Sequence, residues 1–369
     1  MKEKISSLAK IFLYYFDLVS LKFFLINKKE KRDIIIIRTD GIGDFILWIN
    51  SAERLRRFYK DKKITLITTN ENRELAELIN CFDEIICINR KKFTKKIIYR
   101  FKVLKFLTQI ESNTLINPIV SHSSLSEAIA LAIKGSEKVG IESRKVSNLP
   151  SYLEKVILKK YTKLVKIPNS LEHEIEKNFF FTNRITGEDQ KIYLSNKCLE
   201  KIKNYTKQSE KYYLFFIGAS DLKRCLEVLK FVKLANELIE KGKKIILCGG
   251  KNEEELGEKF LRGITKKENV NNLIGKTNIR EIISLVKNAE KVISNETFSS
   301  HLAKLLDKKL ILFLGGGHYG RFFPYPKTIQ GDEEVIIKKM DCFNCNWKCR
   351  YREIPYKCIK DIKIEEVII

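Results

Sequence analysis

The chain has 369 residues, about twice the length of a typical single domain, so its length favours two domains. Hydrophobic residues make up 44% and charged residues 31%, which is typical of a globular protein and excludes an intrinsically disordered one. Lysine and arginine number 70 against 46 acidic residues, a formal net charge of +24. This excess favours an anionic partner: nucleic acid, phospholipid headgroups or a phosphorylated substrate. Because no helix-turn-helix, zinc-finger or RNA-binding aromatic pattern is present, we expect no nucleic-acid partner.

The N-terminal segment, residues 1–28, is predicted to form an amphipathic helix. Its apolar stretch at 8–27 is interrupted by Lys10, Asp17 and Lys22, which a membrane-spanning helix tolerates poorly. Two interpretations stay open: a helix that lies in a membrane interface, and a helix that packs on the protein without lipid contact. Nine cysteines with no signal peptide of ordinary form indicate a reduced, cytoplasmic compartment.

A first predicted domain, residues 29–185, alternates apolar strands with amphipathic helices. Strands are expected at 33–38, 64–69, 84–88, 114–119 and 138–141, and helices at 45–60, 72–80, 95–110 and 124–135, the last ended by Gly135. Repeated strand–helix units predict a parallel sheet with helices on both faces. Residues 145–210 lose this regularity except for a helix at 171–186, and we place the domain junction there.

A second predicted domain, residues 186–341, repeats the alternation. Strands are expected at 212–218, 243–250, 291–296 and 310–315, and helices at 226–242, 253–261, 278–289 and 299–307. Asn278, with Glu281 three residues later, predicts a capping box. The sequence therefore indicates an α/β protein with two Rossmann-like, doubly wound parallel sheets, whose ligands lie beyond the carboxyl ends of the strands. If the two sheets face each other, this position is an interdomain cleft.

Polar and glycine-rich turns follow several of these strands. They comprise Arg38, Asp40, Gly41, Gly43 and Asp44 in the first domain, and Gly218–Lys223, Gly249–Gly250, Asn295–His301 and Gly315–Gly317 in the second. Glycines let a ligand approach the backbone, and helix N-termini offer free N–H groups to a phosphate. Lys223 could balance phosphate charge and Glu296 could accept hydrogen bonds from sugar hydroxyls. Because no GxxxxGK[ST] motif is present, these turns favour a nucleotide-sugar site over a mononucleotide P-loop.

The order of these motifs resembles that of glycosyltransferase family 9, the bacterial heptosyltransferases of lipopolysaccharide core assembly. The resemblance rests on "IIIIRTDGIGDFILWINSAERLRR", on "FFIGAS" followed by Lys223–Arg224, on "KKIILCGGKNEEEL" and on "NLIGKTNIREIISLVKNAEKVISNETFSSHLAKLL". It implies the two-lobed GT-B architecture and transfer that inverts the anomeric centre without a metal. It also implies a nucleotide-sugar donor, ADP-heptose or similar, and a lipid-linked saccharide acceptor.

The resemblance implies a role for each matching residue. Asp44 would be the general base that takes a proton from the acceptor hydroxyl, although it could also be only a first-turn acid of the following helix. Arg38, Asp40, Gly41 and Gly43 would form an acceptor-side loop. The donor-binding residues would be Ser220, Lys223, Thr277, Glu296, Thr297 and His301, although a histidine on a helix face is more often structural.

Three positions depart from the family pattern. Glu296 stands where aspartate is usual, Phe298 where glycine is usual, and Cys225 where tryptophan is usual. A bulky residue at 298 narrows a turn that should cradle phosphate. These departures support a second hypothesis, a non-catalytic nucleotide-sugar-binding protein of the same fold.

A cysteine-rich segment and tail occupy residues 342–369. Cys342, Cys345, Cys349 and Cys358 lie within 17 residues, a spacing that could hold a structural zinc ion or an iron–sulfur cluster, or could belong to a reduced loop. We expect that the reaction requires no cofactor. The leading hypothesis is a cytoplasmic, inverting, metal-independent glycosyltransferase, peripheral at the inner face of the membrane, where basic residues meet anionic lipid.

Overall fold

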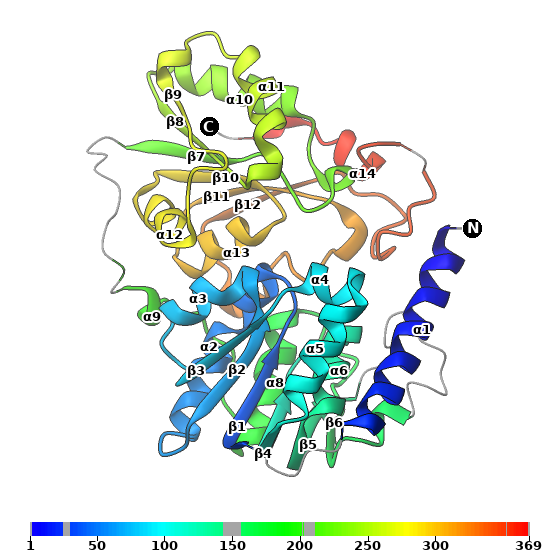
Figure 1. The fold of residues 1–369 in the computed structure, drawn as a ribbon. Coiled ribbons are helices and arrows are strands. Elements are labelled where there is room, and N and C mark those ends of the chain that lie inside the picture. Colours follow the sequence, from blue (N-terminus) through cyan, green and yellow to red (C-terminus); the bar gives the residue numbers. More distant parts are fainter. Residues whose placement is uncertain are drawn as a thin grey trace. The chain divides into compact units, whose positions relative to one another are not determined.

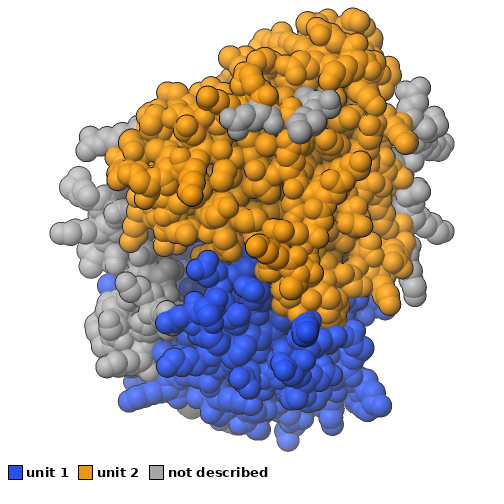
Figure 2. All heavy atoms as spheres, turned by 180° about the vertical axis from the view of Figure 1, so that it is seen from behind, with its two compact units in different colours: residues 1–191 blue, residues 192–369 orange. Residues whose placement is uncertain are grey.

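The structure, a computed structural model, describes residues 2–24, 30–142, 156–200, 202, 211–351 and 353–367, without the side chains of residues 2–10 and 366. The chain divides into two compact units, Met1–Lys191 and Ile192–Ile369 (Figures 1 and 2). Parts of the predicted irregular region, 143–155 and 203–210, lie outside the described residues, as do residues 25–28 of the predicted N-terminal segment.

Unit 1 is a six-stranded parallel sheet with helices. Its strands are β1 (Glu30–Arg38), β2 (Ile64–Thr69), β3 (Glu84–Ile88), β4 (Ile110–Asn117), β5 (Lys134–Ile141) and β6 (Lys163–Val165). Its helices are α1 (Lys2–Phe23), α2 (Ile42–Phe58), α3 (Arg73–Leu78), α4 (Arg90–Lys95), α5 (Ile97–Leu107), α6 (Ser124–Ala132) and α8 (Glu174–Thr186). The central strand β1 is continuously apolar because it is covered on both faces: Ile34 to Ile37 are all buried.

Two predictions for unit 1 were wrong in detail. Helix α6 ends at Ala132, and Gly135 lies inside β5 rather than at the helix end. The strand predicted at 138–141 is not the last of its sheet, because Lys163–Val165 forms β6 beside β5. Both errors arise near the sheet edge, because the first half of β5 is polar and largely exposed and β6 has only three residues, so neither carries a clear apolar periodicity.

Unit 2 repeats this architecture. Its strands are β7 (Tyr212–Phe216), β8 (Lys244–Cys248), β9 (Val270–Asn272), β10 (Lys291–Asn295), β11 (Leu310–Leu314) and β12 (Glu333–Ile337). Its helices are α9 (Lys197–Glu200), α10 (Val228–Glu240), α11 (Glu254–Arg262), α12 (Ile279–Asn288), α13 (Phe298–Leu305) and α14 (Lys357–Lys360). The predicted capping box of α12 is formed, since Asn278 Oδ1 accepts from Glu281 N at 3.0 Å and Glu281 Oε2 from Asn278 N at 2.8 Å.

Both sheets have the same strand order. Unit 1 reads β3-β2-β1-β4-β5-β6 and unit 2 reads β9-β8-β7-β10-β11-β12, with every described pairing parallel. This is the order of a dinucleotide-binding Rossmann fold, in which the strand order reverses between the first and fourth strands. The positions that favour a ligand are therefore the carboxyl ends of β1 and β4 in unit 1, and of β7 and β10 in unit 2.

The N-terminal helix α1 packs within unit 1, beside α5 and α6 (Figure 1). Tyr14 belongs to the hydrophobic core of the unit and is 3% exposed. The buried carboxylate of Asp17 accepts hydrogen bonds from Nε and Nη2 of the buried Arg100 side chain on α5. Among the described residues, no helix is both long and apolar enough to cross a membrane.

Candidate functional site

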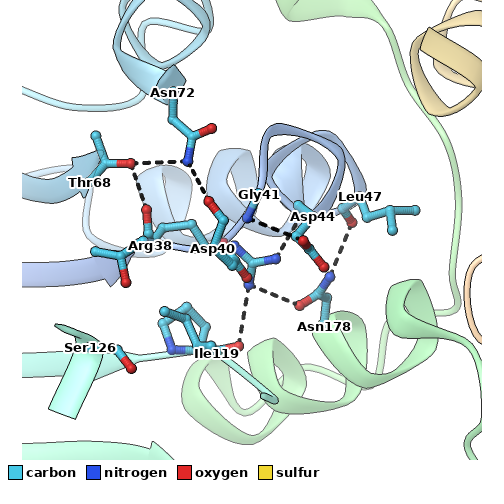
Figure 3. A network of polar contacts seen from close by, with 12 residues as sticks. Arg38, Asp40, Gly41, Asp44, Leu47, Thr68, Asn72, Ile119, Ser126 and Asn178 are labelled. Carbon is cyan, nitrogen blue, oxygen red and sulfur yellow. Dashed lines mark hydrogen bonds and ion pairs between the residues drawn. The ribbon is translucent and has the colours of Figure 1, made fainter. Parts of the chain in front are cut away.

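The turn between β1 and α2 carries the predicted general base. Asp44 lies in the first turn of α2, and its Oδ2 accepts from the backbone N–H of Gly41 at 3.2 Å (Figure 3). The residue is half-buried and lies beyond the carboxyl end of β1, which is the neighbour of β4 in the sheet. Asp44 is therefore a first-turn acid of α2, which fits the purely structural role that the sequence left open. Because it is only half-buried, it is also accessible to a ligand.

Arg38 holds this turn in place. From the end of β1, its buried guanidinium donates to the backbone oxygen of Asp44 at 2.7 Å and to that of Pro118 at 3.4 Å, and lies 3.0 Å from Asp40 Oδ1. A weaker contact of 3.5 Å reaches Asn178 on α8, which donates in turn to Leu47 O (Figure 3). Because Pro118 follows β4, Arg38 spans the point between β1 and β4 where the strand order reverses. We expected Arg38 in an acceptor-side loop; here it positions that loop.

Asp40 has an unusual electrostatic environment. Burial raises the pKa of Asp40 to about 7, against the lowering effect of Arg38; Asp44 and Glu174 raise it further. Its backbone oxygen accepts from Asn72 at 3.1 Å and from Arg90 at 2.7 Å. The charge of Asp40 is therefore sensitive to the neighbouring charges of Arg38 and Asp44. Gly41 is the N-cap of α2, and Gly43 lies in its first turn.

In unit 2, Asn295 joins the two strands at the corresponding reversal. Its amide nitrogen donates to Ile217 O at 2.9 Å and Gly218 O at 3.3 Å, and its Oδ1 accepts from Leu226 N at 2.9 Å. The next residue, Glu296, directly follows β10. Burial raises the pKa of Glu296 to about 8, opposed by the positive charges of Arg224 and Arg321.

Thr297 and His301 belong to the first turn of α13. Thr297 is the N-cap, and its hydroxyl lies 2.7 Å from that of Ser299. His301 is 5% exposed, stacks on Phe323 with ring centroids 4.9 Å apart, and its Nδ1 lies 3.0 Å from the hydroxyl of Tyr325. Phe298 packs edge-on against Phe216 of β7, so its ring occupies the turn where the family pattern has glycine.

Glu253 is a candidate residue that the sequence did not single out among the acids after Gly250. Its carboxylate lies at the carboxyl ends of β7 and β8, where a Cβ added to Gly218 or Gly249 would approach it to 2.1 or 2.2 Å. It accepts from Gly250 N at 3.0 Å, and burial raises its pKa. Both glycines are therefore required for close approach of this acid. The pattern "NEEEL" offers three acids in a row, and only the fold shows which one turns inward.

The other predicted donor residues lie on the turns at this edge. Ser220 and Lys223 are exposed in the turn after β7. Thr277 is half-buried just before α12, two residues after Gly275, whose φ of +74° favours glycine. The Gly275 N–H donates to Gly249 O at 3.0 Å, which ties this turn to the one after β8.

The four cysteines of the C-terminal segment line one small cavity, together with Trp347, Phe343 and other side chains. Among the described residues, no group of three or more histidine, cysteine, aspartate or glutamate side chains has the arrangement of a metal site. The structure therefore brings Cys342, Cys345, Cys349 and Cys358 together without the geometry of a zinc centre. Burial raises the pKa of the Cys358 thiol, with a smaller effect from the other three sulfurs.

The glycines after β11 do not form an open phosphate cradle. A Cβ on Gly316 would lie 2.2 Å from the Phe343 ring, and one on Gly317 would lie 2.3 Å from the Trp347 indole. The cysteine-rich segment thus packs directly on this turn. It also reaches the turn after β7, because Tyr356 N donates to Lys223 O at 2.9 Å and the Arg224 guanidinium lies over Trp347 at 4.6 Å.

A family model described as glycosyltransferase family 9 (heptosyltransferase) matches residues 118–348. The chain belongs to this family. Its alignment with lipooligosaccharide heptosyltransferase 2 of Haemophilus influenzae is 32% identical over 113 residues, 30% of this chain and 31% of that one. The alignment with the Campylobacter jejuni protein of the same name is 26% identical over 141 residues, 37% of this chain and 42% of that one. The chain thus aligns with under half the length of these curated relatives.

Solved structures show the same fold at low sequence identity. E. coli heptosyltransferase WaaC with ADP-2-deoxy-2-fluoro heptose has a TM-score of 0.65 at 17% identity, over 83% of this chain and 92% of that one. E. coli ADP-heptose lps heptosyltransferase II has a TM-score of 0.62 at 15% identity, over 85% and 96%. The prediction of a GT-B fold built from two Rossmann-like units is confirmed.

Proposed function

We propose that this protein is an inverting glycosyltransferase in which Asp44 is the general base. One observation carries the proposal. At the point of unit 1 where the strand order reverses, the half-buried Asp44 accepts a hydrogen bond from Gly41 N, in a turn that Arg38 anchors. A sugar hydroxyl is a poor nucleophile, and a carboxylate that accepts its proton as the new bond forms lowers the barrier. The nucleoside diphosphate leaves from the opposite face of the anomeric carbon, which inverts its configuration.

The donor that we propose is a nucleotide sugar, ADP-heptose or a related compound. It would bind at the carboxyl ends of β7 and β10, where the strand order of unit 2 reverses. Two similar solved structures are of E. coli heptosyltransferase WaaC with ADP and with ADP-2-deoxy-2-fluoro heptose, which supports this class of donor. Lys223 and Arg224 supply positive charge for the pyrophosphate, and the α13 N-terminus at Thr297 supplies N–H groups. Glu296 and Glu253 supply carboxylates that accept hydrogen bonds from hydroxyl groups of the nucleotide sugar. Ser220, Thr277 and His301 are the other proposed donor-binding residues.

The acceptor that we propose is a lipid-linked saccharide of lipopolysaccharide or a related cell-envelope glycan. The names of the curated relatives, lipooligosaccharide and lipopolysaccharide heptosyltransferases, support this choice. Such an acceptor is anchored in the cytoplasmic membrane, so we place the protein at the inner face of that membrane.

The test is Asp44→Asn, which keeps the size of the side chain and removes its basicity. We expect the transfer rate to fall by about 100- to 10,000-fold. The affinity for ADP or ADP-heptose, measured by calorimetry, should stay within about twofold, because the donor residues lie in unit 2. Asp61→Asn, at an exposed acid of unit 1, is the control and should keep full activity. Full activity of Asp44→Asn would refute the base assignment.

A second candidate function, a non-catalytic nucleotide-sugar-binding protein, is favoured by Phe298. Its ring occupies the turn at the start of α13, against Phe216. If this function is correct, ADP-heptose raises the melting temperature, because it binds the native state, yet no transfer occurs with any acceptor. Phe298→Gly would then tighten donor binding, because it reopens the turn.

We propose that transfer requires no metal ion. The positive charges of Lys223, and of Arg224 and Arg321 near Glu296, would neutralise the leaving pyrophosphate in place of a divalent cation. Activity should therefore be unchanged, within about twofold, after dialysis against EDTA. Any metal that copurifies with the cysteine-rich segment would have a structural role. Its removal would lower the melting temperature but leave the rate at saturating donor unchanged while the protein stays folded.

A further inference from the structure

We propose that one surface of unit 1, formed by the outer face of α1 and by α4–α5, docks on an anionic lipid bilayer. The apolar part of this α1–α5 surface consists of Phe12, Tyr15, Val19, Phe23, Ile97, Ile98, Phe101 and Phe106. Its basic part consists of Lys91, Lys92, Lys95, Lys96, Lys102 and Lys105. The inference extends the proposed function, which needs a lipid-linked acceptor, but its test needs no turnover.

The exposed apolar side chains are concentrated on these two helices. Of the fourteen large hydrophobic residues that are exposed in the described part of the chain, eight belong to the α1–α5 surface. Phe23 is 76% exposed, Ile98 69% and Phe12 63%. Scattered apolar residues are normal on a protein surface, whereas a contiguous group marks an interaction site.

The exposed residues of α1 follow helical spacing. Phe12, Tyr15, Val19 and Phe23 are separated by three, four and four positions, so they share one stripe of the helix. The opposite face is already occupied, because Tyr14 is in the core and Asp17 is paired with Arg100. Packing inside unit 1 therefore fixes α1, while the residues of its second apolar stripe are between 44% and 76% exposed.

The two helices form one continuous surface. The ring of Phe101, on α5, lies 4.9 Å from that of Phe24 and 6.5 Å from that of Phe16. Figure 1 shows α1 alongside the helical layer of unit 1 that contains α5. The apolar residues of α5 alternate with exposed lysines, so that both kinds of side chain face outward together.

The charge of this surface selects an anionic partner. Residues 90–109 contain eight lysines and arginines and no aspartate or glutamate. Arg100 is paired internally and Arg90 binds backbone oxygens, which leaves the six exposed lysines of the surface. A second copy of this chain would bring like charges together, and nucleic acid would leave the apolar stripe of α1 uncovered. A bilayer with anionic headgroups matches both the basic and the apolar part of the α1–α5 surface. The lysines bind the phosphate groups, and the apolar side chains enter the membrane interface.

Docking here is linked to the candidate acceptor turn. Arg90, the first residue of α4, donates to the backbone oxygens of Thr39 and Asp40, both at 2.7 Å. Thr39 and Asp40 belong to the turn that presents Asp44. The helix that begins the basic segment is thus bonded to the turn that would receive a lipid-linked acceptor.

The test is cosedimentation of the full chain with vesicles of phosphatidylcholine, with and without phosphatidylglycerol. We expect binding only when phosphatidylglycerol is present, and loss of binding at high salt. Ile98→Glu should weaken binding about tenfold, because it places a charge in the interface. Lys102→Glu with Lys105→Glu should weaken it at least tenfold, since each lysine near an anionic surface contributes about fivefold.

Two matched variants in unit 2 are the controls. Ile354, 70% exposed, is changed to Glu as the apolar control, and Lys266 with Lys267, both exposed, are changed to Glu as the charge control. Both should bind as the wild type, and all variants should keep the wild-type melting temperature. Equal losses in the controls, or no binding to anionic vesicles, would overturn the proposal. A dimer in sedimentation velocity that Ile98→Glu abolishes would instead assign the surface to a second copy. Activity on a soluble acceptor tests the proposed transferase separately.

Discussion

Asp40 and Asp44 lie four residues apart in one turn, yet their roles differ. Asp44 accepts a hydrogen bond from a helix N-terminus, which suits a carboxylate that stays charged. Asp40 is half-buried beside Arg38, and burial raises its pKa to about 7. When Asp40 loses its proton, its negative charge makes Asp44 a stronger base, because the two carboxylates interact.

This coupling predicts a pH dependence of the rate. Asp40 is protonated below about pH 7 and charged above it, so kcat/KM should rise as the pH passes about 7. Asp40→Asn should remove that rise while keeping the rate at pH 6 within about threefold. The measurement is kcat/KM across the neutral range. An unchanged inflection in Asp40→Asn would assign it to another group.

Glu296 predicts a pH dependence of stability. Its pKa is about 8 in the folded state, against 4.5 for an unperturbed glutamate, so the folded state binds the extra proton between these values. The contribution of Glu296 to the free energy of unfolding is therefore complete below about pH 4.5 and is lost as the pH rises through about 8. In Glu296→Gln, the free energy of unfolding should fall by at least about 1 kcal/mol less between pH 4.5 and pH 8 than in the wild type, as measured by urea unfolding. The exposed Glu268→Gln is the control; a wild-type slope in Glu296→Gln would contradict the prediction.

At the scale of elements, the cysteine-rich segment supports the turn after β7. Asn344, Asn346 and Trp347 have φ of +61°, +51° and +59°, the left-handed region. The N–H groups of Asn344 and Asn346 donate to Gly316 O and Gly317 O at 2.7 and 2.9 Å. This backbone path places the Trp347 indole under the Arg224 guanidinium. The segment thus acts on the candidate donor site through a stacked pair.

Trp347→Ala should therefore weaken donor binding. The loss of the stacking surface frees Arg224, and we expect KM for the nucleotide sugar to rise about tenfold with kcat within about threefold. Trp347→Phe should restore most of the affinity. Arg350→Ala, an exposed change in the same segment, should have no effect. Loss of kcat with unchanged KM would refute this positioning role.

The N-terminal helix depends on a buried ion pair. Both partners are at most 1% exposed, so removal of one leaves the other charged and unpaired in the core. Asp17→Ala should lower the free energy of unfolding by about 3–5 kcal/mol in urea. Asp17→Leu with Arg100→Leu should recover part of this loss. Asp341→Ala, which breaks an exposed pair, should change nothing measurable; an equally small effect at Asp17 would contradict the prediction.

The elements could be predicted where periodicity was strong. Continuous apolar runs located β1, β2, β7 and β11, and Asn278 located the start of α12. The short strands β9 and β12 escaped prediction, because "VNN" and "EEVII" carry little apolar pattern and lie at sheet edges. The strand order also could not be read from the alternation of elements.

At the scale of the whole molecule, the sequence could indicate which turns share a sheet edge, but not which side chains meet there. Parallel sheets bring the carboxyl ends of their strands together, which is why Asp44 and Glu296 could be singled out. Asn178 reaches Arg38 across 140 positions, and Arg321 influences Glu296 from a loop after β11. Such contacts depend on the path of the chain in space, which local spacing does not encode.

The packing of the last thirty or so residues has a practical consequence. Ile359, Ile362 and Ile364 belong to the core of unit 2, and Trp347 fills the space above Gly317. A shortened protein that stops at residue 341 would expose apolar surface that these side chains now cover, so it should aggregate rather than yield a smaller transferase. Affinity tags are therefore better placed at the N-terminus, and deletions should spare α1 as well as the C-terminal segment, because Asp17 of α1 pairs with the buried Arg100.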